Sequence, residues 1–168
     1  MVPDKRQPQN WLWLVLRATS AALALAAVCA PGAQAQKETV LLTFTGGATG
    51  FLPYGGLVRD EAGNLYGTAS QGGGSILCSF GGLPGCGVVF KLDPGSRETL
   101  LHSFTGFTDG VGPFYGGSMA RDAEGNLYGA TYNGGPTGNG TVFKVKPNGK
   151  ETVLHAFNHA DGSLPMPV

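Results

Sequence analysis

The chain repeats its own sequence, and this repetition limits the folds open to it more than any other feature. The phrase GNLYG occurs at 63–67 and again at 125–129. Three versions of one strand-like phrase, ETVLLTF, ETLLHSF and ETVLHAF, begin at positions 38, 98 and 151. Units of roughly 50–60 residues are typical of architectures in which each supersecondary unit stacks on the next.

The repetition divides the chain into a first unit at 37–96, a second at 97–150 and a partial third at 151–168. Each full unit contains four runs that are rich in β-branched and aromatic residues and too short for helices. In the second unit these runs are 98–104, 117–122, 126–132 and 141–146. Four sequential antiparallel strands form one blade of a β-propeller. The sequence therefore predicts an all-β, propeller-like protein with two full blades and the first strand of a third.

Glycine-rich turns separate the runs, and glycine makes up 29 of the 168 residues. Gly63 and Gly125 stand just before the third run of each full unit, within DEAGN and DAEGN. Glycine adopts a positive φ without steric cost, so we expect both residues to do so in a tight turn. Asp60 and Asp122 open these two turns, and we expect them to have a structural role there.

The combination of GNLYG, GTVFK, ETVLH and the DG..P loop resembles the GloVer tandem-repeat proteins, and the resemblance covers essentially all of 37–168. Those proteins are bacterial and secreted or surface-bound, and many end in a variable C-terminal anchor. The resemblance implies a propeller-like β repeat outside the cytoplasm, and it brings no established catalytic residues with it. This chain departs from the pattern because it is short and shows no anchor segment.

The N-terminal segment has the layout of a signal peptide. Lys5 and Arg6 form a basic start, an apolar stretch follows at 11–30, and Ala33 and Ala35 fit the small-x-small pattern before a cleavage site. We therefore predict that cleavage after Ala35 releases a secreted, extracellular or cell-surface protein. The alternatives are an uncleaved membrane anchor and, through Cys29, a lipoprotein site.

Composition excludes several classes of function. The 11 basic and 11 acidic side chains cancel, so no basic field attracts nucleic acid. The chain contains no phosphate-binding loop, no zinc-binding cysteine quartet and no nucleophile motif. We accordingly predict no catalytic residue, no metal site and no cofactor.

Cys78 and Cys86 are the most individual feature of the first unit. They lie in an insertion, ILCSFGGLPGC, that the second unit does not share. In an oxidising compartment the two thiols are expected to form a disulfide. The bridge staples a loop, and the alternative is a rigid binding loop, because ligands often bind repeat proteins where insertions collect.

Four residues are candidates for ligand binding: Tyr66, Tyr128, Tyr132 and Asp109. The tyrosine rings would stack on sugars if they reached a loop surface, with Tyr54 and Tyr115 as companions. The alternative is that the rings pack between blades. Asp109 and Asp161 share the DG..P loop, where the alternatives are a turn-stabilising role and a calcium-binding ring, which Thr49 interrupts in the first unit.

His102 and His155 occupy one repeat position, which is Leu42 in the first unit. A position that accepts leucine between apolar neighbours is a packing position, and a site role is the alternative.

The sequence favours a non-catalytic secreted or cell-envelope module that binds a glycan or an envelope protein. The alternative is a propeller-type lyase or glycosidase acting on an extracellular polysaccharide, and a purely structural repeat is a third possibility. Because two blades do not close a propeller, we expect either a fragment of a longer protein or self-association through exposed blade edges, with the strand at 151–157 completing a neighbouring chain's sheet.

Overall fold

The computed structural model describes residues 37–80, 83–113 and 119–165. Its contacts divide the chain into Met1–Thr39 and Val40–Val168, and the account below concerns the second of these units. The expected signal peptide at 1–35, with its cleavage site, lies outside the described residues.

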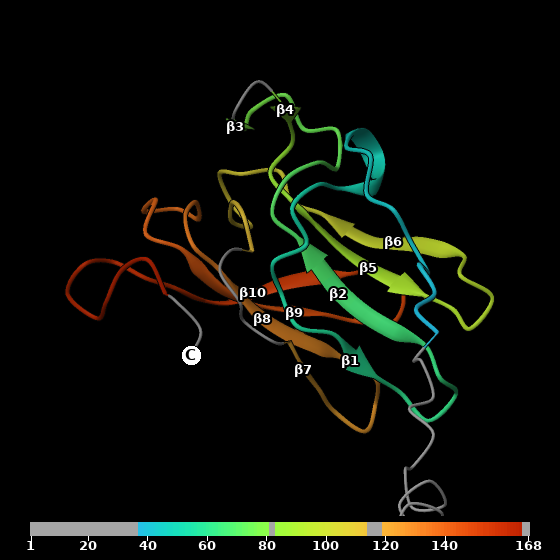
Figure 1. Cartoon of the computed structure of the whole chain (residues 1–168). Coiled ribbons are helices and arrows are strands. Elements are labelled where there is room, and N and C mark those ends of the chain that lie inside the picture. The colour runs from blue at the N-terminus through green and yellow to red at the C-terminus, as the bar shows by residue number, and fades with distance from the viewer. Residues whose placement is uncertain (1–36, 81–82, 114–118, 166–168) are drawn as a thin grey trace, which may run out of the picture. The chain divides into compact units, whose positions relative to one another are not determined.

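The first sheet has the strand order β1-β2-β5-β6. Its strands are β1 (Val58–Arg59), β2 (Leu65–Ala69), β5 (Val88–Leu92) and β6 (Glu98–Ser103), and every neighbouring pair is antiparallel. A small hairpin, β3 (Ser79–Phe80) and β4 (Leu83–Pro84), is inserted between β2 and β5. Figure 1 places this hairpin at the end of the sheet that lies away from the β1–β2 turn.

The second sheet repeats the plan of the first, with the order β7-β8-β9-β10. Its strands are β7 (Ala120–Arg121), β8 (Leu127–Thr131), β9 (Thr141–Val145) and β10 (Glu151–Ala156), again all antiparallel. The described residues contain one short helical turn, η1 (Gly47–Thr49). The expectation of an all-β chain with four-stranded antiparallel units is therefore confirmed.

The grouping of strands into sheets differs from the prediction. The run at 98–104 was expected to begin the second blade, but β6 pairs with β5 and closes the first sheet. In the same way β10 pairs with β9 of its own chain and closes the second sheet, instead of standing alone as the first strand of a third unit. The physical reason is the short connection 93–97, because a tight turn makes the next strand fold back on the last one. The run at 38–44 forms no strand.

A bulge gives the outer strand of each sheet the same shape. Val89 pairs with His102 and Phe90 with Leu100, so Leu101 is the extra residue in β6. The register of β10 shifts between Val153 and His155, which leaves Leu154 in the equivalent place. A bulge turns the unpaired side chain away from the regular alternation of the strand.

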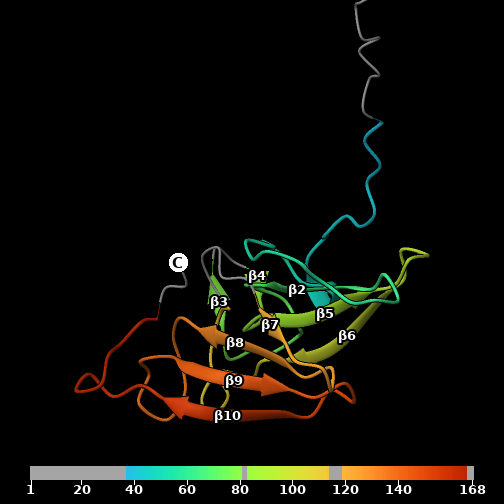
Figure 2. The same ribbon diagram turned by 90° about the horizontal axis from the view of Figure 1, so that it is seen from below.

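The hydrophobic core lies between the two sheets. Figure 2 shows the strands of both sheets from below. The Phe104 and Phe143 rings meet edge to face with their centroids 5.1 Å apart, and both side chains are fully buried. Burying one such side chain contributes about 1.5–3 kcal/mol. The full cluster contains Tyr66, Cys78, Cys86, Val89, Phe104, Met119, Leu127, Phe143 and Val145.

The two predicted tight turns have the expected geometry. Gly63 and Gly125 have φ angles of 85° and 84°. In each turn the glycine N–H donates to the carbonyl of the opening aspartate, at 3.0 Å for Asp60 and 3.1 Å for Asp122. The prediction that glycine supplies a positive φ at both positions is confirmed.

Candidate binding site

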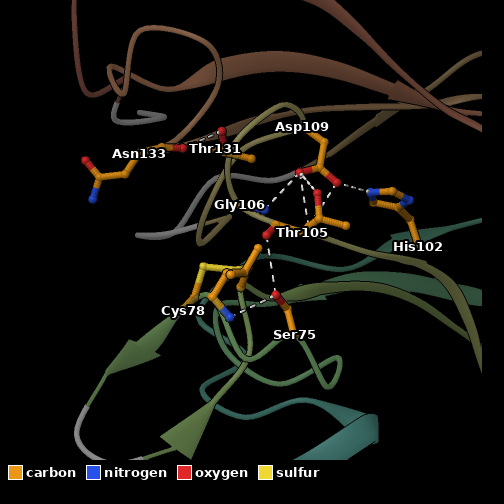
Figure 3. Close-up of a disulfide and its surroundings, with 10 residues drawn as sticks. Ser75, Cys78, His102, Thr105, Gly106, Asp109, Thr131 and Asn133 are labelled. Atoms are coloured by element: carbon orange, nitrogen blue, oxygen red, sulfur yellow. Dashed lines mark hydrogen bonds and ion pairs between the residues drawn. A yellow bond between two sulfur atoms is a disulfide. The ribbon is translucent and has the colours of Figure 1, made fainter.

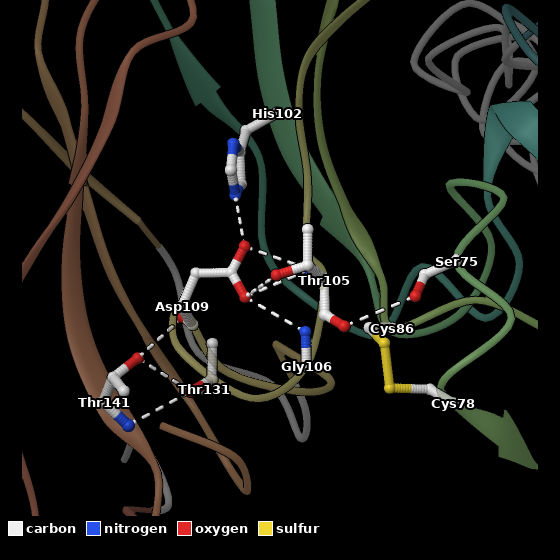
Figure 4. A network of polar contacts seen from close by, with 9 residues as sticks. All are labelled: Ser75, Cys78, Cys86, His102, Thr105, Gly106, Asp109, Thr131 and Thr141. Carbon is white, nitrogen blue, oxygen red and sulfur yellow. Dashed lines mark hydrogen bonds and ion pairs between the residues drawn. A yellow bond between two sulfur atoms is a disulfide. The ribbon is translucent and has the colours of Figure 1, made fainter. Parts of the chain in front are cut away.

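Asp109 holds together the connecting loop, residues 104–113, which leads from the first sheet toward the second. Each of its carboxylate oxygens accepts a hydrogen bond from the Thr105 N–H at 3.0 Å. Oδ1 also accepts from the Thr105 hydroxyl at 2.8 Å and from the Gly106 N–H at 3.0 Å. Nε2 of His102 lies 3.2 Å from Oδ2 (Figure 4). The chain itself therefore uses the acceptor capacity of this carboxylate.

The environment of Asp109 keeps it ionised. Burial alone would raise the pKa of this carboxyl, but hydrogen bonds from His102, Thr105 and Gly106 outweigh that effect and lower its pKa to about 2. Hydrogen bonds to an ionised acceptor are stronger than those between neutral groups. The loop is thus folded around a fixed negative charge.

Two threonines tie the connecting loop to the second sheet. The Thr141 hydroxyl on β9 donates to the backbone carbonyl of Asp109 at 3.1 Å, and the hydroxyls of Thr131 and Thr141 lie 2.9 Å apart. Both threonines are fully buried. Gly110 has a φ of 113°, and a Cβ there would lie 2.2 Å from the Thr131 hydroxyl oxygen. The close approach therefore requires glycine at this position.

The predicted disulfide between Cys78 and Cys86 is confirmed, with Cα atoms 5.0 Å apart. Both cysteines are buried, and both sulfur atoms lie 3.1 Å from the place a Cβ on Gly106 would take. The Ser75 hydroxyl adds a hydrogen bond of 3.3 Å to the Thr105 carbonyl (Figure 3). The bridge therefore fixes the insertion against the connecting loop and does not merely staple a solvent-exposed loop.

A cavity of about 340 Å³ opens beside the disulfide, and we call it the disulfide pocket. The Leu77 and Phe107 side chains at the pocket are 60% and 71% exposed, and the neighbouring Ile76 is 88% exposed. Exposed apolar side chains around a hollow are typical of an interaction site. The pocket is lined by Leu77, Cys78, Gly106, Phe107, Val111, Gly134, Gly135, Pro136 and Gly138. None of these lining residues has a charged side chain or a side-chain hydroxyl, amide or amine group.

The structure places the four predicted ligand-binding residues in different environments and does not gather them at one site. Tyr66 and Tyr128 lie near the first residues of β2 and β8 and donate hydrogen bonds to Asp60 and Asp122, at 2.9 Å and 2.8 Å. The backbone carbonyl of Asp109 accepts a hydrogen bond from Thr141, the first residue of β9.

The remaining tyrosines are placed as follows. Tyr132 is half-buried just beyond β8, and its N–H donates to the Gly112 carbonyl at 3.0 Å. Tyr54 is half exposed. Tyr115, their predicted companion, lies outside the described residues.

Tyr66 packs between the two sheets, in line with the alternative interpretation that the tyrosine rings pack between repeat units. It is buried, and the Arg121 guanidinium of the second sheet lies 5.6 Å from the centre of its ring. Burial, together with the hydrogen bond to Asp60, raises the pKa of the Tyr66 phenol. The Tyr128 ring meets Lys144 of its own sheet at 5.4 Å instead.

The sequence reasoning missed a polar motif that occurs once in each sheet. Asp60 accepts hydrogen bonds from the backbone and side-chain N–H groups of Asn64, both at 2.8 Å, in addition to the Tyr66 hydroxyl. Hydrogen bonding from the Asn64 side chain is the main reason that the pKa of Asp60 falls to about 2. The equivalent residues Asp122, Asn126 and Tyr128 repeat this arrangement. The repeated spacing D…GN.Y was the signal that could have revealed it.

His102 and His155, which occupy one repeat position, were expected to be packing residues. Each also makes a polar contact with an aspartate. His102 is paired with Asp109 and His155 with Asp161, each at 3.2 Å. The first unit has Leu42 and Thr49 at these two positions. The two positions therefore change together within one chain, which is a signal of contact that sequence reasoning overlooked.

Over 37–80, 83–113 and 119–165, no group of three metal-binding side chains comes together. No helix in that part of the chain has the length and apolarity needed to span a membrane.

The repeat found in the sequence and in the two sheets matches a known family model, that of the Gloeobacter/Verrucomicrobia repeat, over residues 33–167. The chain belongs to this family. No curated protein and no solved structure matches the chain. The family match covers both sheets and the disulfide pocket of this Gloeobacter/Verrucomicrobia repeat protein.

Proposed function

We propose that this protein is a secreted or cell-envelope repeat module that binds a protein partner without catalysis. In this proposal the disulfide pocket receives one apolar side chain of the partner. The main support for this proposal is that a cavity of about 340 Å³ has exposed apolar residues at its mouth. Such a cavity lies at the small end of known ligand pockets and suits a single side chain.

The chemistry of the lining favours a protein over a glycan. Sugars are bound by aromatic rings in combination with polar groups that satisfy their hydroxyls. The residues lining the disulfide pocket offer apolar side chains and glycine backbone. An apolar side chain from a partner loses no hydrogen bonds on entering such a pocket.

The disulfide supports a location outside the cytoplasm. Disulfides form and persist in oxidising compartments and are rare in the reducing cytosol. The bridge between Cys78 and Cys86 is buried beside the pocket, so the geometry of the pocket depends on it. The predicted signal peptide at 1–35 agrees with this location.

The proposal includes a propeller-like array. The two sheets have the same strand order and pack face to face through one core cluster, as consecutive blades of a propeller do. No observation favours the alternative lyase or glycosidase. Asp109, its most obvious acid or base, is turned inward and saturated by hydrogen bonds.

Nuclear magnetic resonance tests the pocket. The protein is titrated with N-acetyl-leucinamide, N-acetyl-phenylalaninamide and, as the competing chemistry, N-acetylglucosamine. We expect the two apolar probes to shift the amide signals of Gly106, Gly134 and Gly138, and the sugar to leave them unchanged. Phe107→Ser should weaken these shifts, because the ring lines the pocket. Val40→Ser is the matched control, since Val40 is also apolar and is 72% exposed, against 71% for Phe107, but does not line the pocket.

Shifts that appear with the sugar alone would contradict the protein-binding proposal and support a glycan ligand. Shifts that survive Phe107→Ser unchanged would place the binding elsewhere on the molecule. The location is tested separately, by the intact mass of protein recovered from the medium or envelope after expression of the full chain. A mature protein that begins at Gln36 is expected, and full-length protein retained in the cytoplasm would contradict secretion.

A further inference from the structure

One face of the second sheet is open, although the equivalent face of the first sheet is covered. We call it the open face, and it is formed by Tyr128, Ala130, Val142, Lys144, Leu154 and His155. The strand registers place these residues at the positions that Tyr66, Thr68, Val89, Lys91, Leu101 and His102 occupy in the first sheet. In the first sheet this is the face that packs on the second sheet.

The difference in exposure between the two sheets is large. Val89 is fully buried, but its equivalent Val142 is partly exposed. Leu101 packs against the core cluster, whereas Leu154 is 52% exposed. The side chain of His102 is 17% exposed and that of His155 is 47% exposed. The open face therefore has the residues of an inter-sheet contact, but no sheet within the described residues covers it.

The aromatic residue beyond each outer strand points to the same conclusion. Phe104 follows β6 and packs on Phe143 of the next sheet, and Phe44 packs in the same way on Phe90, with ring centroids 5.1 Å and 5.2 Å apart. Phe157 follows β10 and contacts the ring of its neighbour His155. By the same repeat, Phe157 is expected to pack on a phenylalanine of an adjoining sheet, at the position that Phe90 and Phe143 occupy in their own sheets.

The chain also has the surface that would fit the open face. Leu57 is 56% exposed, whereas Met119, its equivalent in the second unit, is 5% exposed because the first sheet covers it. Arg59 is exposed, whereas its equivalent Arg121 lies over the Tyr66 ring. We call the surface around Leu57 and Arg59 the leading face; Phe90 lies beneath it, 3% exposed and in contact with the Phe44 ring.

We propose that the open face of one copy binds the leading face of a second copy, head to tail, by repeating the contact between the two sheets of one chain. Leu57 of the second copy then enters the interface as Met119 does within the chain. Arg59 of the second copy lies over Tyr128, as Arg121 lies over Tyr66. Head-to-tail contacts of this kind produce rings or open filaments.

Docking requires an exchange at one position. Phe157 of the first copy and Phe44 of the second are equivalent, and both cannot pack on the same Phe90. Phe157 therefore takes the place of Phe44, which leaves Phe90 when the copies associate. Phe44 covers the leading face of the isolated chain and so opposes association. Phe44→Ala is expected to strengthen association, and Phe157→Ala is expected to weaken it.

Analytical ultracentrifugation of protein made from the full chain tests the proposal. We expect the mass of the wild type to increase with concentration. Leu154→Asp removes the open face, and Leu57→Asp removes the leading face, so each variant alone should be monomeric. An equimolar mixture of the two should form a one-to-one dimer, because each variant retains the face that the other lacks.

Three controls make the outcome decisive. Ile76→Ser removes an exposed apolar side chain beside the disulfide pocket and should leave association unchanged. Association that does not depend on this residue separates the self-association proposal from the proposed function of the pocket. Near-ultraviolet circular dichroism checks that the variants fold, and Arg59→Glu replaces Leu57→Asp if the latter does not fold.

A wild type that stays monomeric, or single variants that still associate, would overturn the proposal. Single variants that stay monomeric when mixed would overturn it as well.

Discussion

The first and second sheets are built from nearly the same sequence, yet their side chains have different surroundings. Val89, Leu101 and His102 lie in the core or against it, whereas their equivalents Val142, Leu154 and His155 are partly or largely exposed. The strands, turns and polar motifs are the same in both sheets. The repeated sequence therefore determines the strands and turns of each unit. The position of the unit beside its neighbour determines which of its side chains are buried and so contribute to stability.

The largest expected difference concerns the phenylalanines beyond the outer strands. Phe104→Ala should lower the free energy of unfolding by about 3–5 kcal/mol, because it leaves a cavity in the core. Phe157→Ala should cost about 1 kcal/mol, because the side chain is only half buried. Urea unfolding of both variants measures the difference. Equal losses of stability in the two variants would contradict this expectation and would show that Phe157 is buried as fully as Phe104.

The two His–Asp pairs should differ next. Asp109→Asn should cost about 3 kcal/mol, because it weakens several buried hydrogen bonds at once. Asp161→Asn is the matched control and should have little effect, because its side chain is 38% exposed. The melting temperatures of the two variants at neutral pH measure this difference. Similar losses would mean that the two His–Asp pairs contribute equally to stability despite their different exposure.

The same aspartate predicts a dependence on pH. The pKa of Asp109 is lowered from 3.8 to about 2 in the folded state. Its contribution to stability is therefore complete above pH 4 and is lost as the pH falls from about 4 to about 2. In acid titrations of stability, Asp109→Asn should lose less than the wild type over this interval. Parallel curves for the two proteins would exclude the proposed role of this carboxylate.

The disulfide distinguishes the first unit from the second. Replacing Cys78 and Cys86 by serine should lower stability by about 2–3 kcal/mol, from the entropy of the loop that the bridge closes. Calorimetry with and without a reductant measures this loss. If loop closure is the main effect, the reduced wild type and the double variant should lose similar stability. A much larger loss in the double variant would show that packing of the sulfur atoms against Gly106 is the main contribution.

The smallest difference is expected at the paired tyrosines. Tyr66→Phe should cost about 1 kcal/mol, because it removes a hydrogen bond to Asp60 from a buried side chain. Tyr128→Phe should cost less, since water reaches the more exposed ring. Equilibrium unfolding in urea resolves the pair, and a larger loss for Tyr128 would contradict the assignment of the open face.

Much of the local structure was readable from the sequence. The runs at 126–132 and 141–146 coincide with β8 and β9 to within a residue or so at each end, and the glycine turns and the disulfide are as predicted. The predicted ligand-binding residues were grouped by type, but Tyr66 and Tyr128 lie near one end of the strands, whereas Asp109 contacts Thr141 at the other end. The disulfide pocket was not predicted, because glycines and scattered apolar residues have no recognisable spacing.

The sequence by itself determined the repeat, the strands, the tight turns and the cysteine bridge, because each depends on residues that are close together in the chain. Only the tertiary structure decided that β6 closes the first sheet, that Asp109 turns inward to bind its own loop, and that one face of the second sheet stays open. These features depend on contacts between residues far apart in the sequence. A local pattern sets what a strand can pair with, whereas the packing of whole sheets sets which face is buried.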